Sequence, residues 1–436
     1  MAGPAVRACE MARQLASHHK TTLAALGTQG TLPADFDVID YAESPTRLKQ
    51  SASQADVVIF QGMASKLFPW VEDLKIPIVV DLYDPFQFEN LQLYADLPLS
   101  LQRVRNDRAL DAIKHQLLIG DFFICASERQ RHFWLGMLCA LGRIGPEGNS
   151  QDPSFRALID VVPFGLPDQP PEHTRQVLKG VYPGVDRDDQ VVIWGGGLWD
   201  WLDPLSLIRA IAQLGTKWPN LKLFFMGTQR PGAVPPGTML PAAKELVQQL
   251  GLSDAVIFND WVPYDDRANF LLEADVGVVL SASHLESAFA FRTRVLDYIW
   301  AGLPILCTSG EVTAEIVSAY GLGEAATAGD LNATTQGLDT LLSTQNGRAA
   351  REDQFEAARQ CFRWERAVEP LLRFVENPHR APDATGSRRA VGASKRGSFW
   401  RSMLRAGQLG TASYRAGGMR GAWTALQRQL GYLRFR

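Results

Sequence analysis

The chain has 436 residues, 46% of them hydrophobic and 21% charged, and its formal net charge is −3. This length exceeds what one hydrophobic core supports, so we expect two domains with additions, and the composition excludes a largely disordered chain. No apolar run approaches the roughly 20 residues of a bilayer-spanning helix and no signal peptide opens the chain, so we expect a cytoplasmic protein. The five cysteines include no CxxC pair, which favours reduced thiols over disulfides or a zinc site.

Short apolar runs alternate with helical patterns in the first part of the chain, as in a doubly wound sheet. We expect strands at residues 21–26, 36–39, 55–61, 76–82, 121–126 and 158–162. Residues 2–7 are expected to form a loop that leads into an amphipathic helix at 7–18. Because a doubly wound domain usually opens with its central strand, either the natural start lies upstream, which we favour, or the domain lacks this strand.

A second alternation follows residues 163–171, whose prolines and glycine predict a linker. We expect strands at residues 190–194, 221–226, 255–258, 276–280 and 303–307, and helices at 204–214, 241–251, 264–273, 295–301 and 362–374. The predicted fold class is α/β, with two Rossmann-like doubly wound domains that face a cleft. We expect an N-terminal domain at 1–165, a C-terminal domain with a crossing helix at 166–376, and a basic extension at 377–436.

Three consecutive glycines, Gly195, Gly196 and Gly197, follow the strand expected at 190–194 and precede a helix. Without side chains in the way, their backbone N–H groups can face a pyrophosphate. A tight strand-to-helix turn explains the same residues. A nicotinamide-binding GxGxxG motif starting at Gly195 would require glycine where Asp200 stands, which argues against a dehydrogenase.

A cluster of charged residues lies at the expected start of a later helix, where Arg292, Thr293 and Arg294 precede Asp297 by about one turn. A helix N-terminus with two arginines attracts an anion through its dipole and through the guanidinium groups. An acid one turn further along can accept hydrogen bonds from ribose hydroxyls. The alternative is a solvated first turn with balanced charges.

The segment 191–323 resembles the donor-binding half of the GT-B glycosyltransferases, specifically family four. The resemblance rests on the glycine loop, on the strand end at 224–227, on the stretch 257–263 and on the sequence LDYIWAGLP at 296–304. In that family a carboxylate near the donor sugar precedes a second carboxylate that binds ribose.

Carried over to this chain, the family pattern implies that Glu286 lies near the sugar and that Asp297 binds ribose. It further implies that Val262 and Pro263 border the nucleobase. This chain departs from the pattern at three points: Asp297 replaces the usual Glu, the spacing of the two acids is wider, and residues 199–201 occupy the place of the usual Arg and Lys. We infer that Arg292 and Arg294 supply the missing positive charge.

The first domain resembles the acceptor half of the same family more loosely. Gly3 and Arg7 belong to a segment that is similar to the family's first loop, which lies beneath the donor sugar. Asp84 follows a strand where many relatives have a His beside an acid, and Tyr83 takes the place of that His. Asp84 is therefore a candidate for orienting an acceptor hydroxyl, although Asp before Pro is also a common turn starter.

The resemblance implies a retaining hexosyltransferase that moves a sugar from a nucleotide sugar to a glycan or a lipid-linked acceptor, in surface polysaccharide or glycoconjugate synthesis. It implies neither a metal ion nor a further cofactor, and no nucleic-acid partner. One alternative is a non-catalytic relative that binds a nucleotide sugar or a partner protein. Another is a GT-B epimerase or phosphorylase, although the latter lacks support because no lysine has a cofactor-like context.

The end of the chain is strongly basic. From Arg380 onward it has twelve basic residues and a single acidic one, Asp383, so the rest of the chain is acidic. Residues 398–436 also place tryptophans and leucines at helical spacing, with glycines that favour two short helices over one. Such a tail is typical of binding to an anionic membrane surface, but docking onto the acidic body of the chain is an equal alternative.

Overall fold

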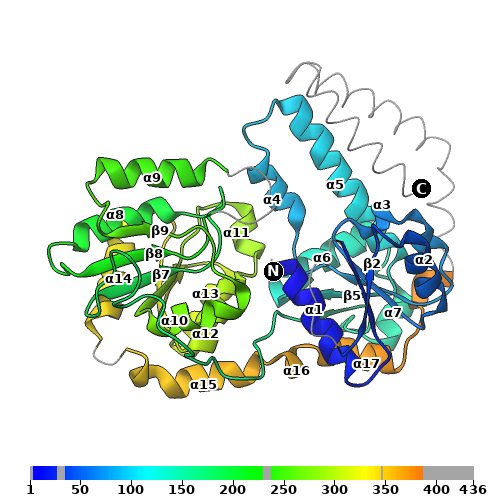
Figure 1. Ribbon diagram of the computed structural model, residues 1–436. Helices are drawn as coiled ribbons and strands as arrows, with labels where there is room; N and C mark the ends of the chain where they lie inside the picture. The colour runs from blue at the N-terminus through cyan, green and yellow to red at the C-terminus, as the bar shows by residue number, and fades with distance from the viewer. Residues whose placement is uncertain (1–2, 27–34, 229–236, 345–346, 386–436) are drawn as a thin grey trace. The chain divides into compact units, whose positions relative to one another are not determined.

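The computed structural model describes residues 3–26, 35–228, 237–344 and 347–385, which form two compact units (Figure 1). Of the described residues, the C-terminal unit comprises those within Phe164–Ala367 together with residues 3–7, and the N-terminal unit comprises those within Ala8–Pro163 together with residues 368–385. The division between the units lies at Pro163 and Phe164, inside the proline-rich segment expected to be a linker. The tail helices expected within 398–436 lie outside the described residues.

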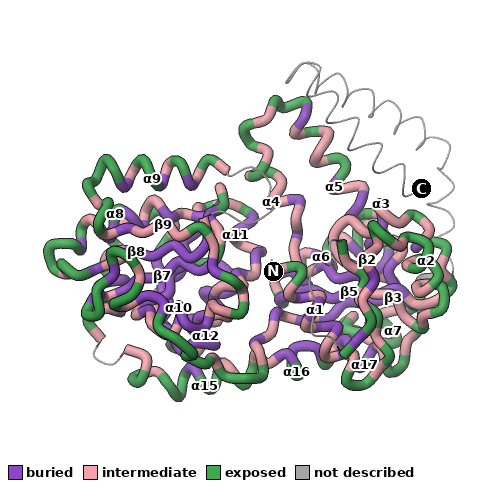
Figure 2. The backbone as a smooth tube through the Cα atoms, viewed as in Figure 1, coloured by how far each residue is buried: buried purple, intermediate pink, exposed green. Residues whose placement is uncertain are grey.

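The C-terminal unit is built on a six-stranded parallel sheet in the order β12-β11-β10-β7-β8-β9. Its strands are β7 (Gln190–Trp194), β8 (Leu221–Phe225), β9 (Val256–Phe258), β10 (Val276–Val279), β11 (Ile305–Thr308) and β12 (Gly323–Ala326). This is the strand order of a dinucleotide-binding Rossmann sheet. Successive strands are first added on one side of the first strand and then on its other side, so the strand order reverses between the two central strands. Here those strands are β7 and β10, and both are almost fully buried (Figure 2).

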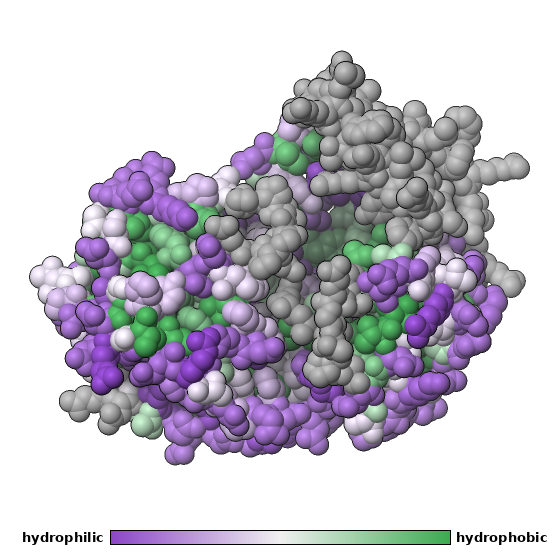
Figure 3. All heavy atoms as spheres, in the orientation of Figure 1, coloured by the Kyte–Doolittle hydropathy of each residue, from purple (hydrophilic) through white to green (hydrophobic). Residues whose placement is uncertain are grey.

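Helices cover both faces of this sheet, as its continuous apolar strands require. They are α8 (Pro204–Leu214), α9 (Met239–Gln249), α10 (Arg267–Glu273), α11 (Leu285–Phe289), α12 (Thr293–Ala301), α13 (Val312–Tyr320), α14 (Leu331–Ser343), α15 (Glu352–Cys361) and α16 (Trp364–Ala367), with 3-10 turns η2 (Tyr264–Asp266) and η3 (Ala349–Arg351). The helix α8 begins where the Asp203 carboxylate accepts the Ser206 N–H at 2.9 Å, with Pro204 in its first turn. Hydrophilic side chains cover the outward face of α9 (Figure 3), whereas Leu240, Ala243 and Val247 are buried.

The N-terminal unit contains a four-stranded parallel sheet in the order β3-β4-β5-β6 and a separate parallel pair, β1 and β2. Its strands are β1 (Thr22–Ala25), β2 (Asp37–Asp40), β3 (Val58–Gln61), β4 (Ile78–Asp81), β5 (Phe122–Cys125) and β6 (Ile159–Val161). Its helices and 3-10 turns are α2 (Pro45–Gln54), α3 (Ala64–Leu67), η1 (Pro69–Asp73), α4 (Phe86–Leu93), α5 (Leu99–Ile119), α6 (Glu128–Ala140), α7 (Pro146–Gln151), α17 (Glu369–Glu376) and η4 (Pro382–Thr385), while α1 (Gly3–Ala16) spans the division between the units. The expected α/β class with two Rossmann-like parts is confirmed.

Two local expectations are wrong. The segment from Gly3 is helical from the start of α1, not a loop as far as Arg7, since Gly3 and Pro4 occupy a first turn where a missing N–H costs nothing. The single helix expected at 362–374 is divided into α16 and α17, because Pro370 lacks the N–H that a helix interior needs and fits only in the first turn of α17.

Candidate active site

The carboxyl ends of β7 and β10 bring two loops together at the point where the strand order reverses. The glycine loop, Gly195–Gly197, follows β7, and the segment from Leu280 to α11 follows β10. Leu202, just beyond the glycine loop, forms a bridge with Ser281. Open α/β sheets bind ligands at this position, so the fold places the glycine loop at the expected ligand site.

A tyrosine of α12, Tyr298, fixes the start of the glycine loop by hydrogen bonding. The Gly195 N–H donates a 2.8 Å hydrogen bond to the Tyr298 hydroxyl, which donates to the Val278 carbonyl at 2.9 Å. Tyr298 is fully buried, and this burial raises its pKa to about 12, so it stays neutral. Gly196 has a φ of 78°, which favours glycine, and it is exposed. In the described part of the chain the N–H groups of Gly196 and Gly197 have no protein acceptor and remain available to a ligand.

Arg294 lies beside the glycine loop. Its Nη2 donates to the Gly197 carbonyl at 3.2 Å, and its guanidinium lies 5.2 Å from the centre of the Trp194 ring. The buried Nη1 has no hydrogen-bond partner among the described residues. Burial lowers the pKa of Arg294 to about 10, which leaves the group cationic at neutral pH. Its neighbour Thr293 is the first residue of α12.

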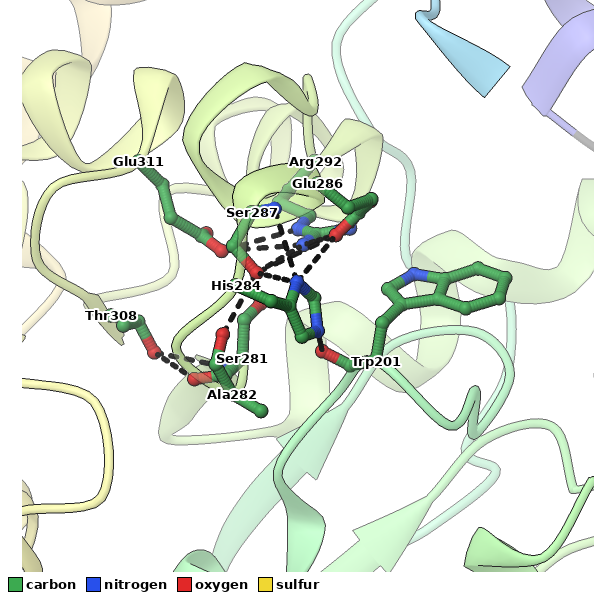
Figure 4. Close-up of polar contacts among 9 residues, drawn as sticks. All are labelled: Trp201, Ser281, Ala282, His284, Glu286, Ser287, Arg292, Thr308 and Glu311. Carbon is green, nitrogen blue, oxygen red and sulfur yellow. Dashed lines mark hydrogen bonds and ion pairs between the residues drawn. The ribbon is translucent and has the colours of Figure 1, made fainter. Parts of the chain in front are cut away.

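Arg292, by contrast, is enclosed by two carboxylates (Figure 4). Its Nη1 and Nη2 donate to Glu286 Oε1 and Oε2 at 2.8 and 2.7 Å in a bidentate ion pair. The same Nη2 lies 3.3 Å from Glu311 Oε1. All three side chains are buried. Burial raises the pKa of Glu311, and the nearby Arg292 acts in the opposite direction. The charge of Arg292 is therefore neutralised by the carboxylates of Glu286 and Glu311, and the three side chains form a buried triad.

His284 fixes the segment that contains Glu286. It precedes α11, and its Nδ1 accepts the Ser287 N–H at 3.4 Å, while its Nε2 lies 3.1 Å from the Trp201 carbonyl (Figure 4). Burial lowers the pKa of His284, so the ring is neutral at pH 7. A neutral imidazole with Nε2–H satisfies both contacts, and the ring thereby joins α11 to the loop after β7.

Asp297 lies one turn after Arg294, and its side chain is 38% exposed. Its Oδ1 accepts a 3.0 Å hydrogen bond from Arg267 Nε, and that guanidinium stacks on the rings of Tyr264 and Trp300 at 3.7 and 4.6 Å. The stretch that ends in Val262 and Pro263 leads into the turn that contains Tyr264; Val262 is buried and Pro263 precedes η2.

The remaining candidate residues lie on other elements. Gly3 is in α1, where an ideal Cβ would lie 3.9 Å from Thr293 Oγ1. Arg7 is fully buried, with its guanidinium 4.9 Å from the centre of the Phe164 ring. Asp84 is in the loop between β4 and α4 of the N-terminal unit.

Two site residues were missed in the sequence. Tyr298 follows Arg294 by four positions, the spacing that places two side chains on one helix face, and this signal was available. Glu311 follows β11, the strand beside β10, so its proximity to Arg292 depends on the strand order and had no local signal.

Comparison with known proteins agrees with the fold described above. Residues 186–360 match the family model of the glycosyl transferases group 1. Sucrose-phosphate synthase from Thermosynechococcus elongatus has a similar structure at 15% identity, with a TM-score of 0.61 over 86% of this chain and 93% of that one. Anabaena HepE in complex with UDP aligns at 16% identity and a TM-score of 0.62 over 86% and 96%. WaaG, a glycosyltransferase involved in lipopolysaccharide biosynthesis, aligns at 16% identity and a TM-score of 0.60 over 87% and 97%.

These likenesses define the class of the protein. Its fold is GT-B, and the matched part of its C-terminal unit is a group 1 glycosyl transferase domain. No curated protein sequence matches the chain significantly. Among the described residues, no helix has the length and apolar character needed to cross a membrane.

Proposed function

We propose that the chain transfers a sugar from a nucleotide sugar, with retention of configuration, to a glycan or lipid-linked acceptor in surface polysaccharide or glycoconjugate synthesis. One observation carries the donor assignment: at the carboxyl end of β7, Arg294 lies beside Gly196 and Gly197, whose N–H groups have no acceptor among the described residues. A diphosphate needs such a combination of a fixed cation and backbone donors. Anabaena HepE, which shares the fold, has been crystallised with UDP and with UDP-glucose.

The same groups supply the electrostatic part of transfer. As the bond between sugar and diphosphate breaks, negative charge grows on the leaving phosphate, and donors already in place stabilise it without reorganisation. Arg294 and the glycine N–H groups perform this role in our proposal, so no divalent metal is required. Asp297 keeps one carboxylate oxygen for a ribose hydroxyl while Arg267 holds the other.

The roles of Glu286 and Asp84 in this proposal rest on the family resemblance. Glu286 lies in α11, just before α12, and would face the sugar, and Asp84 would orient the acceptor hydroxyl. The membrane-facing role of the basic tail rests on its sequence alone, and it suits a lipid-linked acceptor.

One observation favours a second candidate, nucleotide-sugar binding without transfer. Both carboxylate oxygens of Glu286 are bonded to Arg292, which leaves Glu286 less free to act on a sugar. Slow hydrolysis of the donor in the absence of acceptor separates the two candidates, because an enzyme hydrolyses its donor whereas a binding module only retains it.

The donor site is tested by calorimetric titration with UDP-, GDP-, ADP- and dTDP-sugars in the presence of EDTA. We expect micromolar binding to one nucleotide. Arg294→Ala should weaken it about 10- to 100-fold, the effect of removing one or two charge-assisted hydrogen bonds, and Asp297→Ala should weaken it as well. Arg209→Ala, which removes an exposed arginine of α8, is the matched control and should bind like the wild type. Equal affinity in all four proteins would refute the site.

A further inference from the structure

An exposed tryptophan, Trp199, is the second residue after the glycine loop. Trp199 is 38% exposed as a residue, whereas Trp201, two residues further on, is only 7% exposed. The two rings stack with 5.3 Å between their centres and 1° between their planes. Trp201 therefore supports one face of Trp199 and leaves part of the indole open to a ligand.

The segment that carries Trp199 is fixed at several points. The Trp199 carbonyl accepts the Leu202 N–H at 3.0 Å, and the Trp201 carbonyl accepts the Ala282 N–H at 3.3 Å. Between them, the Asp200 carboxylate accepts the Met239 N–H at 3.0 Å at the start of α9. An exposed aromatic ring on such a fixed backbone loses little conformational freedom when it binds a ligand.

Trp199 lies next to the proposed phosphate site. An ideal Cβ on Gly197 would lie 3.4 Å from the Trp199 Nε1, while the Gly197 carbonyl is bonded to Arg294. The indole N–H has no protein acceptor among the described residues. By contrast, the indole N–H groups of Trp134, Trp218 and Trp300 each have an acceptor at 2.8–3.0 Å.

We propose that Trp199 is the platform for the donor sugar, an inference that rests on the proposed function. An indole carries no charge and cannot neutralise phosphate, so its ligand is an uncharged group adjacent to the diphosphate. A pyranose fits this description, because its C–H groups form an apolar face that packs on the ring while a hydroxyl accepts the indole N–H.

A nucleobase is the other uncharged end of the donor, and a different tryptophan is placed for it. An ideal Cβ on Gly227, after β8, would lie 3.2 Å from the ring of Trp261 and 3.8 Å from the backbone of Gly196. Trp261 immediately precedes Val262 and Pro263, the stretch expected to border the base. Trp199 thus lies beside Gly197 and Trp261 lies beside Gly227, and on this ground we assign the sugar to Trp199.

The test compares each nucleotide sugar with its free nucleoside diphosphate: UDP-glucose with UDP, GDP-mannose with GDP, ADP-glucose with ADP, and dTDP-glucose with dTDP. For the pair that binds the wild type, Trp199→Ala should weaken the nucleotide sugar about ten-fold, as expected for losing one apolar contact face. The affinity for the free diphosphate should be unchanged. Trp199→Phe keeps a ring but loses the N–H and should weaken the nucleotide sugar only two- to three-fold.

Leu250→Ala is the matched control, because Leu250 is a comparably exposed apolar residue (42%) at the end of α9. Equal weakening of sugar nucleotide and free diphosphate in Trp199→Ala would overturn the proposal in favour of a nucleobase or phosphate contact. Wild-type affinity for both ligands would overturn any donor role of Trp199. A wild-type protein that binds no member of the panel would instead refute the proposed function.

Discussion

Replacing Arg292 by methionine should lower the free energy of unfolding of the C-terminal unit. Arg292 immediately precedes α12, the helix expected to bind the donor, but its contacts indicate a structural role. The substitution keeps most of the side-chain volume but leaves Glu286 and Glu311 buried without their shared cation. Breaking a buried ion pair in this way costs about 3–5 kcal/mol. Domains are stable by only about 5–15 kcal/mol, so the variant loses a large part of its free energy of unfolding.

The size of this loss should depend on pH. Burial raises the pKa of Glu311, and Arg292 opposes this rise, so removal of Arg292 leaves the folded-state pKa still higher. An acid whose pKa is raised in the folded state lowers the free energy of unfolding at pH values above its unfolded-state pKa, which is about 4.3 for Glu. Below that pH the acid is protonated in both states and has no such effect. The penalty of Arg292→Met should therefore be large at pH 7.5 and should shrink as the pH falls towards 4.5.

Urea unfolding measures this penalty, and hydrogen exchange of peptides from β10 and α12 assigns it to the C-terminal unit. Glu311→Gln is the informative companion, because it leaves one cation with one carboxylate; we expect a change within about 1 kcal/mol. A loss below about 1 kcal/mol for Arg292→Met at pH 7.5, or a loss that stays constant down to pH 4.5, would refute the triad as an electrostatic unit.

Two further predictions follow from the site and from the tail. Tyr298→Phe should lower the free energy of unfolding by about 1–3 kcal/mol, because the buried Gly195 N–H loses its acceptor; it should also weaken nucleotide binding, and urea unfolding with calorimetry measures both effects. Deletion of residues 398–436 should abolish co-sedimentation with anionic phospholipid vesicles at low salt, whereas equal sedimentation of the full and truncated chains would contradict a membrane role for the tail.

Much of the fold of the C-terminal unit could be predicted because its strands are buried on both faces. A continuous apolar run such as 191–194, followed by three glycines, specifies both the strand β7 and its end, and Pro204–Leu214 matches the expected helix. Local signals of this kind do not specify pairing. Nothing in the runs at Thr22–Ala25 and Asp37–Asp40 indicates that they form a sheet of their own.

The candidate site was less predictable, because its partners are distant in the sequence. Arg292 and Glu311 are 19 residues apart, and Arg267 and Asp297 are 30 apart. Each pair forms because the strand order brings two loops or helices together. The residue types indicated an anion site, but they did not indicate which charges neutralise one another.

The two arginines show that position in the chain, and not residue type alone, determines which groups a guanidinium contacts. Arg292 is the extended residue before α12, and Arg294 is the second residue of the helix, so their side chains leave this segment in different directions. One direction leads to Glu286 and Glu311, and the other leads to the carbonyl of Gly197. The same short segment therefore places one guanidinium in a structural ion pair and the other at the glycine loop. We therefore propose that Arg294, and not Arg292, supplies the positive charge for a donor diphosphate at this helix start.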